Sequence, residues 1–175
     1  MAQSWNLFTP PLLTLLDDSN TSTRSRGLSI LSSFLPKMGG ERLQRTGLGD
    51  VFEDAVMPTL MFLPNITPVD ESIELLRPAY NALFVLADVR WMVEGTLDTQ
   101  TKVKNQQEQA KFYDRIMRQG ILTGYAHAYE HLKIVELLIG EISGLVGKMG
   151  VHTVKHLKVI ANFFPRQSTS YPNLI

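Results

Sequence analysis

Apolar residues recur at intervals of three and four along almost the whole chain, and this spacing constrains the fold more than any other feature. The clearest stripe is formed by Val135, Leu138, Ile142, Leu145 and Met149. Such a stripe lies on one face of an α-helix, whereas a half-buried strand would alternate apolar and polar residues. Alternation of that kind is almost absent, so the sequence predicts an all-α fold.

Prolines, glycines and capping residues divide this pattern into separate helices. Pro10 suits the first turn of the first helix, because an amide there needs no intrahelical partner. Pro58 is expected to kink or split a helix, and Thr67 is expected to cap the next one, with Pro68 at its first helical position. The predicted helices cover residues 10–18, 24–38, 50–63, 68–89, about 109–124, about 125–149 and 151–164, with a short helical turn and a connector at 40–50.

These helices come in three pairs joined by short turns. The pairs are 10–18 with 24–35, 56–65 with 71–86, and 134–150 with 151–164. The spacing from Leu16 to Leu63, matching places in the first two pairs, falls in the range of about 40 to 47 residues typical of HEAT repeats. Since one pair cannot bury its apolar face alone, neighbouring pairs stack. The sequence therefore predicts a HEAT-like helical-repeat solenoid of about three helix pairs plus an extra helix, with an irregular helical bundle as the alternative.

We expect residues 1–165 to form this single domain. The most polar stretch, residues 94–109, is predicted to be a loop leading into a helix, and residues 166–175 an irregular tail. In the first pair, Asp18 ends one helix, and Arg24 or Arg26 opens the next. The Asp18 carboxylate can accept amide groups at the start of the second helix, and the arginine can pair back to it or to the neighbouring repeat.

Charge and cysteine content exclude several classes of protein. Lysine plus arginine and aspartate plus glutamate number 17 each, so the chain lacks the basic excess of a nucleic-acid binder. Without cysteine there is no disulfide framework, which fits an intracellular protein. Residues 134–151 are apolar, but Glu136, Glu141 and Lys148 interrupt them and argue against a membrane span. The N-terminal residues lack the pattern of a signal peptide.

The stretch HAYEH at 127–131 matches the H-x-x-E-H pattern of one class of zinc peptidase. There, two histidines hold the metal and the glutamate, here Glu130, activates water. Such an enzyme also needs a third protein ligand and a substrate cleft, and the known examples have a much larger fold. His131 also continues the apolar stripe of the helix. We therefore interpret His127 and His131 as residues between packed helices, and expect no catalytic residue, metal or cofactor.

His152 and His156 complete the set of histidines but are not expected to join the first two. In an antiparallel hairpin, His131 would lie about 27 Å from the connecting turn, whereas His152 and His156 lie close to that turn. The four histidines therefore cannot surround one metal ion.

Two further motifs are interpreted without catalysis. The glycines of RTGLGD at 45–50 lack the Lys-Ser/Thr of a phosphate-binding loop and a strand before them, so they are interpreted as loop glycines. Thr67 followed by Pro68 matches a proline-directed phosphorylation site.

Three stretches, residues 12–35, 43–87 and 149–164, together resemble the Tel-two-interacting protein two family. The middle stretch is the most specific, with RTGLGDVF at 45–52, a leucine-proline turn, T-P-x-x-E-S and a P-A-Y helix. The resemblance runs over nearly the whole chain and is weaker between residues 94 and 109. Because members of that family are considerably longer, this chain is expected to be a C-terminal portion of one, or the product of a short gene model.

The resemblance implies an all-helical scaffold without enzymatic activity, the smallest subunit of the TTT co-chaperone complex. Its implied partners are two larger helical-repeat proteins, Tti-one and Tel-two. With the heat-shock chaperone machinery, these proteins help phosphatidylinositol-3-kinase-related kinases to mature, in the cytoplasm and the nucleus. No direct contact with nucleic acid or membrane is implied.

Four basic residues on inner helices are predicted to be exposed contacts for the Tti-one protein: Arg24, Arg77, Lys155 and His156. Lys155 and His156 form a small basic cluster with Lys158. A second group is predicted to be structural: Asp18, Gly27, Gly47, Gly49, Thr67 and Tyr80.

Two other functions compete with that of a scaffold in the TTT complex. One is a helical-repeat adaptor with different partners, and the other is a small zinc-dependent hydrolase built on HAYEH.

Overall fold

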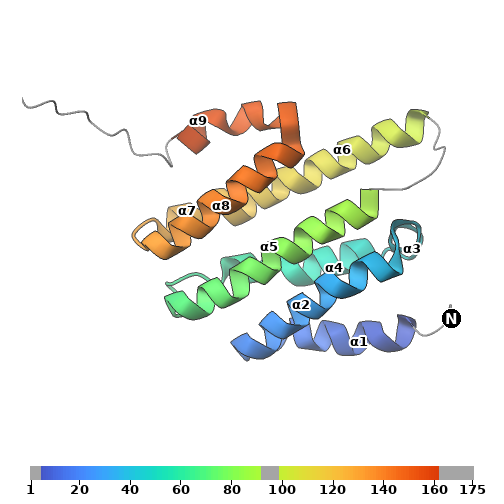
Figure 1. Ribbon diagram of the computed structural model, residues 1–175, viewed down its shortest axis with the longest axis horizontal. Coiled ribbons are helices and arrows are strands. Elements are labelled where there is room, and N and C mark those ends of the chain that lie inside the picture. The colour runs from blue at the N-terminus through green and yellow to red at the C-terminus, as the bar shows by residue number, and fades with distance from the viewer. Residues whose placement is uncertain (1–4, 92–98, 162–175) are drawn as a thin grey trace, which may run out of the picture.

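The computed structural model describes residues 5–91 and 99–161, and every regular element in these ranges is a helix (Figure 1). In chain order the elements are α1 (Trp5–Leu16), α2 (Thr21–Met38), α3 (Gly40–Thr46), α4 (Leu48–Val56), the 3-10 helix η1 (Met57–Met61), α5 (Val69–Trp91), α6 (Thr99–Arg115), the π-helical segment η2 (Ile116–Leu122), α7 (Thr123–Ala128), α8 (Leu132–Met149), the 3-10 helix η3 (Gly150–His156) and α9 (Leu157–Ile160). The predicted all-α class is confirmed.

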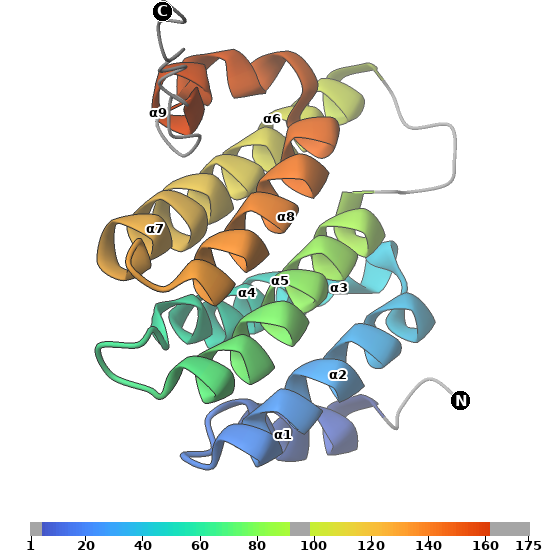
Figure 2. The ribbon, with the colours of Figure 1, turned by 60° about the vertical axis from the view of Figure 1, so that its left-hand side comes forward.

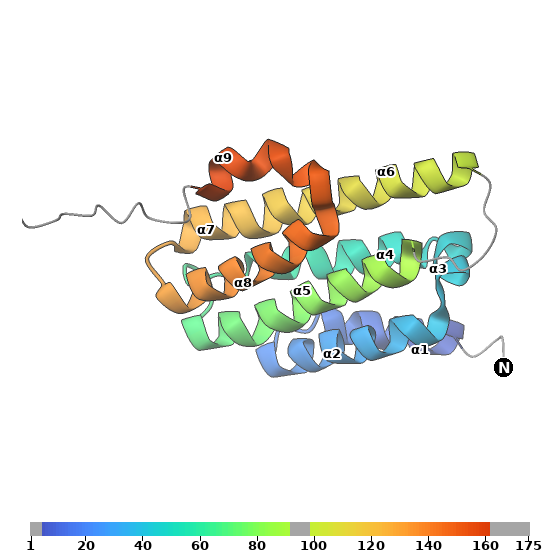
Figure 3. The ribbon, with the colours of Figure 1, turned by 45° about the horizontal axis from the view of Figure 1, so that its top comes forward.

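The helices stack as pairs in two layers. Helix α1 packs on α2, α4 with η1 packs on α5, and the run from α6 to α7 packs on α8. Helices α2, α5 and α8 lie side by side in one layer, while α1, α4 and α6 lie in the other (Figures 2 and 3). This arrangement agrees with the predicted helical repeat, and its first two pairs are the predicted ones.

The third pair differs from the prediction. Residues 99–109, predicted to belong to a loop, form most of α6, which continues through η2 into α7 and runs antiparallel to α8 (Figure 3). The stretch is rich in lysine, glutamine and glutamate, which favour helices as strongly as leucine does. It looks like a loop in the sequence because α6 buries only Phe112 and Tyr113 among its own residues.

The segment after α8 was predicted to be a helix paired with it, and this prediction is also wrong. Residues 150–156 form the 3-10 helix η3, and α9 covers only Leu157–Ile160. Val151, Thr153 and Val154 are β-branched and weaken an α-helix here, and Gly150 has a φ of 52°. The predicted helix end at Pro165 and the predicted tail at 166–175 lie outside the described residues.

Prolines shape the helix ends, although not always as predicted. Helix α1 begins at Trp5, so Pro10 and Pro11 lie inside it rather than in its first turn. Pro58 splits a helix as predicted, because α4 ends at Val56 and continues as the 3-10 helix η1. At the start of α5, the Ser72 amide donates to the Pro68 carbonyl at 2.8 Å, so Pro68 takes the capping place predicted for Thr67.

One apolar core runs through the stacked pairs. Its fully buried side chains include Leu28 and Leu35 of α2, Leu76 and Leu83 of α5, and Leu138 of α8. Burial of a leucine stabilises the folded chain by roughly 1.5–3 kcal/mol relative to exposure. Because these residues come from the layer of α2, α5 and α8, the core holds consecutive pairs together.

Two residues predicted to be structural have clear packing roles. A Cβ atom at Gly27 would lie 2.9 Å from the Leu15 Cβ atom, so the absence of a side chain allows α1 and α2 to approach closely. Tyr80 is completely buried in α5.

Among the described residues, none of the helices has the length and apolar character needed to cross a membrane.

Candidate functional site

The HAYEH stretch spans a break between two helices instead of lying on one. Helix α7 ends at Ala128 and α8 begins at Leu132, so His131 sits in an extended conformation at the N-terminus of α8. The Nδ1 atom of His127 is hydrogen-bonded to the Thr123 carbonyl oxygen at 2.8 Å. The prediction of one helix over residues 125–149 is therefore wrong, and the two histidines lack the shared helical face that the zinc-peptidase pattern requires. No set of three or more potential ligands meets elsewhere in residues 5–91 and 99–161.

Arg24 is buried, contrary to the predicted exposure. The residue is 9% exposed, and Nε donates to the Asp18 carbonyl oxygen at 2.9 Å. The guanidinium group lies 4.4 Å from the centre of the Phe62 ring, a cation–π distance. Asp18 accepts the Asn20 amide through its carboxylate at 2.7 Å, as predicted. Arg24 thus pairs back to the turn as predicted, but through a backbone carbonyl, and it joins the first helix pair to the second.

His156 is also buried, at 5% exposure, again contrary to the prediction. Its Nε2 atom lies 2.6 Å from Oδ1 of Asp114 on α6, and the Lys155 ammonium lies 2.7 Å from the same oxygen. Arg118 reaches the second oxygen of Asp114 at 3.1 Å. Lys155 and His156 thus attach η3 to α6, and Arg118, on η2, pairs with the same carboxylate from the run that continues α6.

The electrostatic environment of Asp114 favours its ionised form. Burial raises the pKa of its carboxyl group, but hydrogen bonds from Lys155 and His156, together with the charges of Lys155 and Arg118, outweigh burial and lower the pKa below 3.8. The basic cluster predicted around Lys155 and His156 therefore has an acidic partner within the chain.

Arg77 is exposed on α5, and its charge acts on Glu141 of α8. Burial raises the pKa of the Glu141 carboxyl group, and the charge of Arg77 partly offsets that rise. Of the four predicted contacts, the structure brings only Lys155 and His156 together. Arg77 and Lys155 are exposed, whereas Arg24 and His156 are not.

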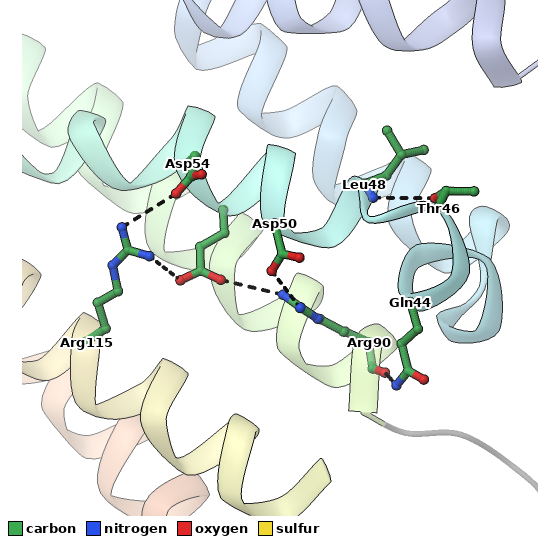
Figure 4. Close-up of polar contacts among 8 residues, drawn as sticks. Gln44, Thr46, Leu48, Asp50, Asp54, Arg90 and Arg115 are labelled. Carbon is green, nitrogen blue, oxygen red and sulfur yellow. Dashed lines mark hydrogen bonds and ion pairs between the residues drawn. The ribbon is translucent and has the colours of Figure 1, made fainter. Parts of the chain in front are cut away.

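The most extensive polar network was not anticipated from the sequence, and it connects α4, α5 and α6 (Figure 4). At its centre is Glu53, whose side chain is 11% exposed and accepts from Nη1 of Arg115 at 2.8 Å. Arg90 approaches the other oxygen of Glu53 at 3.6 Å and pairs with Asp50 at 2.7 Å. Arg115 also lies 3.6 Å from Asp54. The second helix pair is thereby joined to the third.

Gly49 makes room for this network. A Cβ atom there would lie 3.2 Å from Cδ and Nε of Arg90, closer than nearly all real contacts of a Cβ atom. The side-chain amide of Gln44 donates to the Arg90 carbonyl oxygen at 2.7 Å (Figure 4). The prediction that Gly49 is structural is therefore supported by its packing. Gly47, also predicted to be structural, separates α3 from α4 with a φ of 70°.

Burial controls the titration of Glu53. It raises the pKa of the carboxyl group above 4.5, and the charges of Arg115 and Arg90 only partly oppose this rise. Asp50, Glu53 and Asp54 share one helix face at spacings of three and four residues, a signal visible in the sequence. Their arginine partners are distant in the sequence and could not have been identified from it.

A groove lies beside this network, between α1 and the α4–η1 segment. It has a volume of about 630 Å³, with Leu13, Ala55 and Pro58 among its apolar residues and Asp17, Asp18 and Asp54 among its polar ones. No nucleophile paired with a base lines it, so its shape and charge suit binding rather than catalysis.

Comparison with known proteins identifies a family. The model of the Tti2 family matches residues 1–165. No curated protein and no solved structure matches the chain. The matched range includes all three stacked helix pairs, the Glu53 network and the groove.

Proposed function

The chain belongs to the Tti2 family, and from this membership we propose that it is a non-catalytic scaffold subunit of the TTT co-chaperone complex. In this proposal it binds Tti-one directly and acts together with Tel-two. The complex supports the maturation and stability of phosphatidylinositol-3-kinase-related kinases with the heat-shock chaperone machinery. Its place of action is the cytoplasm and the nucleus.

The family match over residues 1–165 carries this proposal. The stacked helix pairs support it, because helical repeats expose extended surfaces on which partner proteins can bind. The Glu53 network supports it further, since it fixes the second pair against the third, and the Asp114 cluster fixes η3 against α6. Both sets of contacts keep such a surface rigid. A rigid surface loses less conformational entropy when a partner binds.

Of the predicted partner contacts, we retain Arg77 and Lys155, both exposed. Arg24 and His156 act through the fold, because each is buried against another helix pair or segment. Phosphorylation of Thr67 remains a prediction, and the low exposure of this residue, 8%, argues against it.

The experiment that tests the proposal is an affinity capture from a eukaryotic lysate. The tagged chain is the bait, and mass spectrometry identifies the proteins retained with it. Recovery of Tti-one and Tel-two at levels well above a tag-only control is the expected result. If circular dichroism shows a folded helical bait that retains neither protein, the scaffold proposal is wrong. Retention of other proteins instead would favour an adaptor with different partners.

A further inference from the structure

The groove between α1 and the α4–η1 segment combines an apolar surface with an unbalanced negative charge. Its apolar part includes Leu13 and Ala55, both half-buried, and Pro58, which is exposed. Three aspartates and one arginine line it, Asp17, Asp18, Asp54 and Arg24. We call this surface the acidic groove.

The position of two of these carboxylates makes the negative charge stronger. Asp17 and Asp18 directly follow α1, whose last turn has no basic residue. The C-terminus of a helix carries partial negative charge, so a carboxylate there is disfavoured. A cation supplied by a partner would remove that penalty.

The cation already present does not neutralise the acidic groove. Arg24 donates to the Asp18 backbone carbonyl and stacks on Phe62, so it is directed to the turn and the ring rather than to a carboxylate. Asp54 is 73% exposed, and its distance to Arg115 is 3.6 Å. Asp17 forms no side-chain ion pair with another described residue.

Thr59 also lines the acidic groove and is almost completely buried there, at 1% exposure. The wall of the groove on the η1 side is therefore closely packed.

The acidic groove continues into a second hollow across α4 and η1. This hollow has a volume of about 330 Å³ and shares Asp54 and Pro58 with the groove. Its other residues include Met57, Met61 and Gln119, and Arg115 is its cation, so the excess of negative charge belongs to the acidic groove. Residues from α1 to α7 line the two hollows, as a bound stretch of polypeptide requires.

We propose that the acidic groove binds a segment of the partner protein in which lysine or arginine residues accompany apolar ones. Its cations pair with Asp17, Asp18 and Asp54, and its apolar side chains pack on Leu13, Ala55 and Pro58. This inference rests on the proposed function, which supplies the partner, and adds the surface and the chemistry of the segment. Association through such charges is faster and more selective, and it weakens as salt screens them.

The test measures binding of the purified chain to purified Tti-one by isothermal titration calorimetry, at low and high sodium chloride concentration. The test variant combines Asp17→Lys with Asp54→Lys. The matched control combines Glu130→Lys with Glu136→Lys, which makes the same change of charge at exposed positions near the start of α8. Circular dichroism compares the folding of all variants. If the lysine variant does not fold, a variant that combines Asp17→Asn with Asp54→Asn replaces it as the test variant.

The expected result is a loss of affinity of at least about tenfold in the test variant, with little change in the control. The affinity of the unmodified chain should fall with added salt, and that of the test variant should fall less. If the folded test variant binds with the same affinity as the unmodified chain, the acidic groove is not the binding surface, while the proposed function still stands. If the unmodified chain does not bind Tti-one at all, the proposed function fails first and the groove inference falls with it.

Discussion

The Glu53 carboxylate on α4 accepts a hydrogen bond from Arg115 on α6 at 2.8 Å, although the two residues are 62 positions apart in sequence. Arg90 on α5 approaches the same carboxylate at 3.6 Å. One acidic side chain therefore contacts basic groups from two other helices. Because those helices belong to different pairs, Glu53 fixes the stacking of the second pair on the third.

Removal of this carboxylate should loosen the stack. We expect Glu53→Ala to lower the free energy of unfolding by about 1–3 kcal/mol, since it leaves Arg90 and Arg115 without their shared acceptor. Glu53→Gln should cost less, because burial already raises the pKa of Glu53 and so favours an uncharged side chain. Urea denaturation measures both. Asp54→Ala, at an exposed position in the same network, should change stability by less than about 0.5 kcal/mol. Equal losses for Glu53→Ala and Asp54→Ala would show that Glu53 has no special role.

The stability of the chain should depend on pH at low pH, because of Asp114. Its folded pKa lies below 3.8, so the stabilisation is present above pH 3.8 and is lost as the pH falls through the folded pKa. Asp114→Asn should therefore be less stable than the unmodified chain at neutral pH, and the difference should shrink below pH 3.8. Urea denaturation from pH 7 to pH 3 measures this difference. Asp70→Asn, in an exposed pair with Lys133, should show little effect. A difference for Asp114→Asn that stays constant with pH would contradict the assignment.

Two glycine substitutions should have opposite effects on stability. Gly27→Ala would place a Cβ atom 2.9 Å from Leu15 Cβ and 3.1 Å from the Leu15 carbonyl, so α1 and α2 must move apart. We expect it to lower the free energy of unfolding by about 1–3 kcal/mol. Gly144→Ala in α8 meets nothing within 4 Å and should stabilise the chain by up to about 1 kcal/mol. Thermal unfolding of both variants checks the two signs. A stabilising Gly27→Ala would mean that the first pair packs less closely than described.

The sequence was sufficient to predict the first two helix pairs. Their helices have strong apolar periodicity, and Pro58 and Gly39 mark helix ends that depend only on local backbone geometry. It was not sufficient for α6, because a helix with few buried residues has little periodicity and resembles a polar loop. It also failed for η3, whose place against α6 depends on Asp114 in a distant helix. Contacts between segments far apart in sequence leave no local pattern.

The same limit applies to the predicted partner contacts. Arg24 was expected to be an exposed residue of an inner helix, and arginine is in general rarely buried without a partner. The turn at Asp18 supplies that partner through a backbone carbonyl, whose direction no residue type reveals. His156 is buried for a similar reason, since its partner Asp114 comes from another element. Glu53 was missed because its arginines are likewise remote in sequence.

Zinc should have no effect on the folded chain. His127 and His131 lie on either side of a helix break, so they cannot hold the metal as the peptidase pattern requires. We expect one equivalent of zinc to leave the thermal midpoint unchanged, because a ligand raises the midpoint only if it binds the folded state. Metal analysis after dialysis should find far less than one zinc per chain. A raised midpoint that disappears in His127→Ala together with His131→Ala would restore the hydrolase alternative.

Arg24 and Arg77 should respond differently to mutation, because one lies inside the fold and the other on its surface. Arg24→Ala removes a buried hydrogen bond and a cation–π contact, and should lower the free energy of unfolding by about 1–3 kcal/mol. Arg77→Gln should leave the thermal midpoint nearly unchanged and weaken the binding of Tti-one about tenfold, as arginines in interfaces often do. Thermal unfolding and titration calorimetry on the same samples separate the two effects. If Arg77→Gln binds like the unmodified chain, Arg77 is not a contact, and Lys155 remains the exposed candidate among the four predicted residues.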